Sequence, residues 1–204
     1  MRRAIPTFGT QMSASVAPIV LVVDDEPDVA DAYAAQLEGQ YTVLTAYSGQ
    51  EALETLDETV DIVLLDRRMP GLSGDDVLER IRDRGLDCRV AMVTAVDPDF
   101  DIIEMPFDAY ITKPVSRDDL FETIDRLLTF QTYEKQFQEL YRVMSKVATL
   151  QANKSETELQ HNDPYQRLLD RRDHLRDRLD ETMLSFDDDD FTTAFKEFND
   201  ADSE

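Results

Sequence analysis

Three aspartates stand directly after short apolar runs, in positions where acidic side chains can do chemistry. Asp24 and Asp25 follow the run Ile-Val-Leu-Val-Val, and Asp66 follows the run Ile-Val-Leu-Leu. If these runs are parallel strands of one sheet, their carboxyl ends meet at one edge, where ligands bind in open α/β sheets. The sequence therefore predicts that the three carboxylates converge in one crevice.

A cluster of three carboxylates repels itself, and a hard cation relieves that repulsion. Mg²⁺ prefers one or two carboxylates together with waters and phosphate oxygens. A carboxylate can also attack phosphorus as a nucleophile and become an aspartyl phosphate. A simpler alternative, an acidic pair in a solvated turn, is equally open for Asp24 and Asp25 considered alone.

Two further polar residues stand at the ends of later apolar runs. Thr94 closes the fourth run, and its hydroxyl could bond a phosphoryl oxygen. Lys113 follows the fifth run, and its ammonium could pair first with Asp66 and then with the phosphoryl group. Either residue alone is more simply a strand-end hydroxyl or a surface lysine. Their coincidence with the aspartates at one edge of one predicted sheet favours the functional interpretation.

The elements that must position these residues alternate in type along the first part of the chain. The apolar runs are Ile19–Val23, Tyr41–Ala46, Ile62–Leu65, Val90–Val93 and Ala109–Ile111. Segments with helical spacing lie between them, which is typical of a parallel sheet covered on both faces. We therefore expect a doubly wound, five-stranded α/β domain. The segment Asp97–Asp108 contains two prolines and leaves room only for a short helix around Phe100–Glu104.

Residues 18–128 resemble the receiver domain of two-component response regulators, which has a flavodoxin-like fold. The matching residues are Asp24 and Asp25 in VVDDEP, Asp66 in LLDRRMPGLSG, Thr94-Ala95, and Lys113-Pro114 in AYITKP. The resemblance implies that Asp66 is the phosphoacceptor and that a sensor histidine kinase supplies the phosphoryl group. It implies a switch whose activity is limited to its own phosphorylation and dephosphorylation, rather than an enzyme with other substrates.

The resemblance also implies a Mg²⁺ site and a switch residue. The implied metal ligands are Asp24, Asp25, Asp66 and the backbone carbonyl of Arg68. Tyr110, three residues before the lysine, matches the family's switch aromatic, although a half-buried core tyrosine is an equally good interpretation. The Asp97–Asp108 segment is shorter than the family's usual fourth helix and loop. That departure bears on the family's usual output face and not on the phosphorylation site.

The second part of the chain has a helical pattern throughout. Neither Gly nor Pro interrupts Ser116–Ser155, so we expect residues 117–150 to form one long helix. An apolar seam with steps of three and four, typical of a coiled coil, runs along it: Phe130, Tyr133, Phe137, Leu140, Met144 and Val147. We expect a turn or linker over Asn153–Asn162. Asp163 and Pro164 then predict the N-cap and first residue of a second helix.

The C-terminal sequence resembles the haloarchaeal HalX domain over residues 129–199. The resemblance rests on the position behind a receiver, the helical pattern and the DF-x-x-x-F ending at Asp190–Phe195. Asp187–Asp190 is expected to begin a last short helix, because acidic residues suit a helix N-terminus. Its apolar face would consist of Phe191, Phe195 and Phe198. We expect residues 200–204 to fray.

Two outputs are open for this helical part. If the helix after Pro164 covers only part of the seam, the remainder invites a homodimer, whereas full cover leaves a monomer. DNA binding is the other output, and basic residues do recur on the second helix: Arg167, Arg171, His174 and Arg178. Acidic residues interleave with them, and residues 130–204 carry 10 basic against 18 acidic side chains. This charge favours a solvated, salt-bridged face over a nucleic-acid surface.

The amino-acid composition restricts the binding partners and the cellular environment of the protein. The net charge of −23 over 204 residues repels nucleic acid in dilute salt. An acidic surface with 5 Lys beside 16 Arg suits the salt-rich cytoplasm of a halophile, where screening is strong. The single Cys88 suits a reducing cytosol, and no apolar stretch is long enough for a membrane helix. We expect a cytoplasmic protein with a disordered lead over residues 1–17, in which Met12 is an alternative start.

A metal-dependent phosphatase is the remaining alternative. Enzymes of that class require two aspartates separated by one residue at the end of the first strand, but the residue two positions after Asp24 is Glu26. It would also leave Asp66, Thr94 and Lys113 without a joint role. We therefore rank the phosphorylation switch above it.

Overall fold

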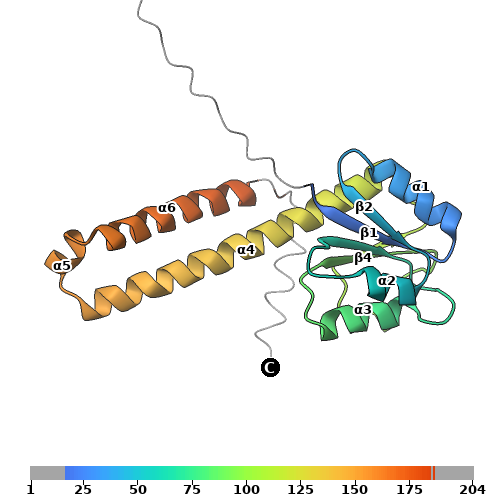
Figure 1. Cartoon of the computed structure of the whole chain (residues 1–204), viewed down its shortest axis with the longest axis horizontal. Coiled ribbons are helices and arrows are strands. Elements are labelled where there is room, and N and C mark those ends of the chain that lie inside the picture. The colour runs from blue at the N-terminus through green and yellow to red at the C-terminus, as the bar shows by residue number, and fades with distance from the viewer. Residues whose placement is uncertain (1–16, 185, 187–204) are drawn as a thin grey trace, which may run out of the picture.

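The computed structural model describes residues 17–184 and residue 186 and begins with an α/β domain (Figure 1). Its strands are β1 (Ile19–Val23), β2 (Thr42–Ala46), β3 (Ile62–Leu65), β4 (Arg89–Thr94) and β5 (Ala109–Thr112). All neighbouring strands pair in parallel in the order β2-β1-β3-β4-β5. The expected doubly wound five-stranded sheet is therefore confirmed, and it places the carboxyl ends of β1, β3, β4 and β5 along one edge.

Helices cover both faces of this sheet. The helices are α1 (Pro27–Leu37), α2 (Gly49–Thr55), α3 (Gly74–Asp83) and the start of α4 (Arg117–Asn153). Apolar side chains of α2 and α3 pack on one face, and those of α1 and α4 pack on the other. The central strands are buried on both faces, which explains why their sequences are continuous apolar runs rather than alternating ones.

The segment between β4 and β5 is short. It holds a single turn of 3-10 helix, η1 (Phe100–Ile102), where the sequence left room only for a short helix. Asp99 accepts a hydrogen bond from the backbone N–H of Phe100 (2.7 Å) and so begins this turn. The expected short helix is confirmed, and its first residue is largely exposed.

The second part of the chain is a helical hairpin built on α4. This helix spans 37 residues without a break, starts at a capping box formed by Ser116 and Asp119, and carries the chain well away from the sheet (Figure 1). α5 (Glu156–Gln160) forms the tip, and α6 (Asp163–Met183) returns alongside α4. The single long helix is thus confirmed.

Two expectations about the hairpin tip were wrong. The stretch expected to be a turn or linker contains α5, because Ser155 and Glu158 form a capping box that starts another helix. Asn162 rather than Asp163 is the N-cap of α6, since its side chain accepts the hydrogen bond from the N–H of Tyr165 (2.9 Å). Asp163 is therefore the first helical residue.

The two halves of α4 belong to two different cores. Leu120, Ile124 and Leu127 are buried under the sheet, whereas Leu140 and Val147 are buried against α6. Between these halves, Gln131 donates a hydrogen bond to the carbonyl of Asp87 (3.1 Å). A rigid helix therefore links the α/β domain to the hairpin without a flexible joint.

The apolar seam of α4 is covered only in part. Leu140 and Val147 face α6 as expected, together with Val143. Phe137 and Met144, two other members of the predicted seam, are exposed. α6 contacts one side of α4, so positions that flank this side lie outside the contact. None of the helices among the described residues is both long enough and apolar enough to cross a membrane.

Candidate functional site

Four of the expected residues meet at the carboxyl edge of the sheet. Asp24 directly follows β1, Asp66 follows β3, Thr94 is the last residue of β4, and Lys113 follows β5. Asp24, Asp66 and Thr94 are buried, and Lys113 is half-buried. Parallel register brings these strand ends together across three strand pairings, so residues up to 89 positions apart become neighbours.

Lys113 joins the two buried carboxylates. Its Nζ donates to Asp24 Oδ2 at 2.6 Å and to Asp66 Oδ1 at 2.8 Å. The second oxygen of Asp66 accepts a hydrogen bond from the backbone N–H of Arg68 at 2.8 Å. Asp66 is thus held by a cation on one oxygen and a peptide dipole on the other, which keeps its carboxylate in one orientation.

Burial and pairing act on these groups in opposite directions. Burial raises the pKa of Asp66 above the usual carboxyl value, while the hydrogen bond and charge of Lys113 oppose that rise. Burial alone would lower the pKa of Lys113, but its hydrogen bonds to Asp24 and Asp66 outweigh burial and raise that pKa. Lys113 therefore carries its charge at neutral pH and can act as a fixed cation beside Asp66.

Asp25 does not join this pair. It is half-buried and lines an open hollow of about 460 Å³. The other lining residues are Arg67, Arg68, Met69, Pro70, Ser73 and Asp75. Within the described part of the chain, no three His, Cys, Asp or Glu side chains come close enough together to hold a metal ion. The structure therefore brings two of the three expected carboxylates together, with Lys113 between them.

The donor chemistry at this edge still fits Mg²⁺. The ion takes one or two carboxylates and completes its shell with water and phosphate oxygens, so it needs no cage of three carboxylates. Asp25 faces an open hollow, which leaves room for such waters. Carboxylate and carbonyl oxygens are also the hard donors that this ion prefers.

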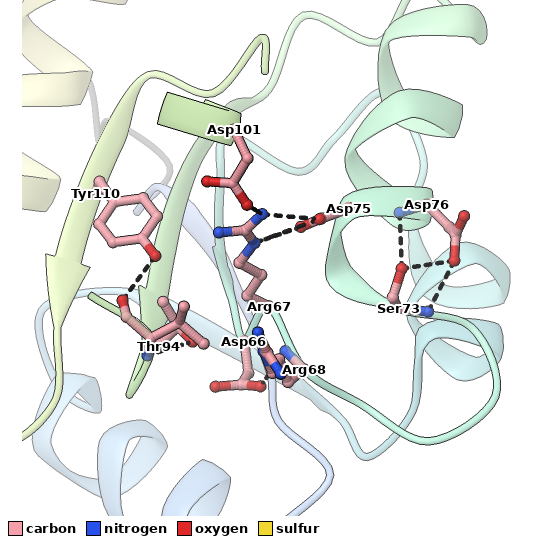
Figure 2. Close-up of polar contacts among 10 residues, drawn as sticks. Asp66, Arg67, Arg68, Ser73, Asp75, Asp76, Thr94, Asp101 and Tyr110 are labelled. Carbon is pink, nitrogen blue, oxygen red and sulfur yellow. Dashed lines mark hydrogen bonds and ion pairs between the residues drawn. The ribbon is translucent and has the colours of Figure 1, made fainter. Parts of the chain in front are cut away.

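A buried arginine that the sequence did not single out lies in the loop that follows Asp66. Arg67 is 8% exposed, and its Nε and Nη2 bond Asp75 of α3 at 3.0 and 3.2 Å (Figure 2). Its Nη2 also bonds Asp101 of η1 at 2.5 Å. These two carboxylates raise the pKa of Arg67 above its usual value. Arg67 thus ties the loop after Asp66 to both neighbouring segments.

Nothing in the spacing of the sequence pointed to Arg67. Its partners lie 8 and 34 positions along the chain, on elements whose relative placement depends on the packed sheet. The only available signal was an arginine next to Asp66 and a run of acidic residues in the short segment that became η1.

Thr94 and Tyr110 share one neighbour. Thr94 Oγ1 accepts a hydrogen bond from the N–H of Val96 at 3.3 Å, and Tyr110 donates its hydroxyl hydrogen to the carbonyl of Val96 at 2.8 Å. Tyr110 is half-buried and packs on Phe107, with ring centroids 5.5 Å apart. Val96, two residues beyond the end of β4, is therefore connected through its N–H to Thr94 of the site and through its carbonyl to Tyr110 of β5.

The start of α3 closely approaches the loop that follows Asp66. Gly74 is the first helical residue, inside the capping box that Ser73 and Asp76 form, and its N–H donates to the carbonyl of Arg67 at 2.9 Å. A Cβ at Gly74 would lie 2.2 Å from the carbonyl oxygen of Asp66. Only glycine allows this contact, so the backbone after Asp66 rests directly on the first turn of α3.

Comparison with known proteins divides the chain into two parts. Residues 20–125, just over half of the chain, match the response regulator receiver domain, and residues 129–195 match the HalX domain. The chain is 57% identical over 133 residues to a protein of Haloferax volcanii whose name proposes a role as a transcriptional regulator. That match covers 65% of this chain and 23% of the relative.

A second relative comes from a bacterium. The response regulator SaeR of Staphylococcus aureus is 34% identical over 143 residues, which cover 64% of this chain and 63% of the relative. The chain therefore spans less than two thirds of the length of these relatives.

Solved structures resemble the α/β domain. A CheY-like response regulator receiver domain protein from Methanospirillum hungatei JF-1 has a TM-score of 0.54 at 28% identity and covers 57% of this chain and 98% of its own. A response regulator receiver domain protein from Clostridium thermocellum has a TM-score of 0.52 at 30% identity. The match covers 56% of this chain and 97% of that protein.

Proposed function

Because this chain belongs to the response regulator receiver family, we propose that it is a two-component response regulator that accepts a phosphoryl group on Asp66. The observation that carries the proposal is the buried Asp66 carboxylate, which Lys113 and the N–H of Arg68 hold at the edge of the sheet. Its donor is the phosphohistidine of a sensor histidine kinase. A carboxylate oxygen forms a bond to phosphorus, the bond from phosphorus to imidazole nitrogen breaks, and the imidazole leaves with a proton.

Membership of the receiver family implies Mg²⁺ as the cofactor for phosphorylation. We assign it to Asp24, Asp25, Asp66 and the backbone carbonyl of Arg68. The ion would supply positive charge to the phosphoryl oxygens as they approach Asp66. Asp24 and Asp25 follow β1, and Asp24 shares Lys113 with Asp66. The open hollow at Asp25 leaves room for the waters of the ion and supports this assignment.

Lys113 and Thr94 take the roles that respond to phosphorylation. Lys113 now pairs with an oxygen of Asp66 and would pair with the phosphoryl group once Asp66 is phosphorylated. The Thr94 hydroxyl would donate to another phosphoryl oxygen, and a movement toward that oxygen would lengthen the hydrogen bond that it accepts from the N–H of Val96. Because the Tyr110 hydroxyl donates to the carbonyl of Val96, a shift of Val96 would also move the ring of Tyr110.

The helical hairpin is the output module in this proposal. α4 begins in the core of the receiver and ends in the core of the hairpin, so a shift at the receiver moves the hairpin as a rigid arm. We propose that the output acts through protein contacts of the hairpin.

DNA binding is a second candidate, favoured by the proposed regulatory role of the Haloferax volcanii relative. The charges of the hairpin argue against DNA binding. Arg171 pairs with Glu139, and Arg172 pairs with Asp173, so two arginines of α6 already have acidic partners. Titration of genomic DNA fragments at several KCl concentrations separates the two outputs. Binding that weakens steeply as salt rises indicates phosphate contacts.

Phosphorylation of Asp66 can be tested by intact mass. With Mg²⁺ and a small phosphodonor, the parent should gain one phosphoryl group. Asp66→Asn should abolish this gain, because the amide is not a comparable nucleophile. Asp118→Asn, an exposed position at the start of α4, is the matched control and should keep it. An unchanged mass gain in Asp66→Asn would refute the assignment of the acceptor.

A further inference from the structure

One side of α4 carries large apolar side chains that α6 does not cover. Phe137, Tyr141 and Met144 are 46%, 69% and 52% exposed. Their spacing of four and three residues places them on one side of the helix, next to the side that packs on α6. We call this set the α4 stripe. A contiguous apolar surface of this kind on a strongly acidic protein indicates a binding surface.

The described chain ends at one end of this stripe. Phe186 stacks on Phe130, with ring centroids 4.8 Å apart, and meets Tyr133 edge-on at 5.7 Å. Tyr133 in turn stacks on Phe137 at 6.4 Å. The chain that follows α6 has therefore already turned onto this side of α4 and joined the row of aromatic rings that leads into the stripe.

The sequence that follows has the same spacing as the stripe. Residues 187–204, which lie outside the described residues, contain Phe191, Phe195 and Phe198, again four and three positions apart. Four aspartates, Asp187–Asp190, precede them, and acidic residues favour the first turn of a helix. The expected last helix thus has an apolar face that matches the stripe in length and spacing.

We propose that the C-terminal segment, residues 187–204, binds the α4 stripe as a third helix parallel to α4. Two parallel helices advance together at about 1.5 Å per residue. A helix that starts beside Phe130 and Tyr133 therefore brings Phe191 level with Phe137. The equal spacing then brings Phe195 level with Tyr141. The stripe extends roughly 17 Å beyond Tyr133. Residues 187–199, without the end that we expect to fray, would span roughly 20 Å as a helix, so the segment is long enough.

A second copy of the chain is the competing occupant. Two copies, each with a charge of −23, repel each other unless salt is high. The C-terminal segment starts next to the stripe and therefore has an effective concentration on the order of millimolar. In the proposed arrangement the stripe is closed to a second copy, so a dimer formed through it would require the segment to leave.

Cysteine crosslinking in the full chain tests the proposal. The native Cys88 is buried, so only the two introduced thiols should react. Tyr141→Cys with Phe195→Cys should form a disulfide within one chain under mild oxidation. The control pair, Lys146→Cys with Phe195→Cys, places the first thiol on the far side of α4 and should react roughly tenfold more slowly, because the two thiols cannot approach. Circular dichroism before oxidation verifies that both variants are folded.

Each outcome is decisive. Monomer-sized disulfide in the Tyr141 pair, at a rate well above the control, supports the proposal. Crosslinked dimers assign the stripe to a second copy and overturn it. Equal rates for the two pairs also overturn it, because the segment then has no preferred side of α4. Light scattering of the parent at molar KCl should give a monomer mass, and a dimer that Tyr141→Asp dissociates would contradict the proposal.

Discussion

Gly74→Ala tests the contact between α3 and the loop that directly follows Asp66, which we call the acceptor loop. Two effects of this substitution oppose each other. Alanine has a higher helix propensity than glycine, worth up to about 1 kcal/mol in a helix interior. The added Cβ, however, would lie 2.2 Å from the carbonyl oxygen of Asp66 and 2.8 Å from Cα of Arg67. Propensity predicts a more stable protein, and packing predicts a less stable one.

The packing effect should win. The Cβ would lie more than roughly 1 Å inside ordinary van der Waals separation. Both neighbours are backbone atoms, so no side chain can rotate away. An added methyl group in a packed region costs about 1–3 kcal/mol, and the upper end applies where the backbone must shift. We expect a net loss of about 2 kcal/mol in the free energy of unfolding, and slower phosphorylation, because the loop that holds Asp66 moves.

Urea denaturation followed by circular dichroism measures the first effect, and the rate of phosphoryl incorporation measures the second. Gly85→Ala is the matched control. Its Cβ would have open space, although the positive φ of 66° imposes some backbone strain. Both variants should therefore lose stability, but only Gly74→Ala should be phosphorylated more slowly. If Gly74→Ala were as stable as the parent and were phosphorylated at the same rate, α3 would not rest on the acceptor loop.

Three further predictions concern the site, the hairpin and the surface charge. Lys113→Met should lower the free energy of unfolding by about 3–5 kcal/mol, because Asp24 and Asp66 would remain buried without their cation; a urea titration that matches the parent would contradict this. Leu175→Ala, at a position only 3% exposed, should cost about 2–5 kcal/mol through the cavity it leaves, whereas Leu184→Ala at 86% exposure should be nearly neutral in the same assay. The melting temperature should rise as KCl goes from tenths of molar to molar, because screening reduces the repulsion within a chain of charge −23; a flat or falling trend would remove the halophile interpretation.

Local patterns were sufficient to predict much of this protein. The apolar runs predicted all five strands to within one or two residues, because buried parallel strands need continuous apolar sequence. Residues that directly follow such strands must meet at one edge of the sheet. The positions of Asp24, Asp66, Thr94 and Lys113 at that edge could therefore be predicted once the strands were recognised.

Local hydrogen-bonding signals were ambiguous at the hairpin tip. Asn162 and Asp163 are both good N-cap residues, and their order along the chain does not say which one caps α6. Ser155 and Glu158 have the spacing of a capping box, but such a box starts a helix only if the residues after it can pack. Leu159 packs against the hairpin core, which explains why α5 forms.

Only the tertiary structure decided which seam residues are covered and what holds the acceptor loop. A spacing of three and four residues places Phe137 and Leu140 on neighbouring parts of one helix surface. The direction from which α6 approaches determines that Leu140 is buried and Phe137 is exposed. Arg67 likewise found partners on α3 and η1 that are distant in sequence. Spacing along the chain determines which side chains share a face. Contacts between elements depend on how the whole domain packs, and no local pattern records that arrangement.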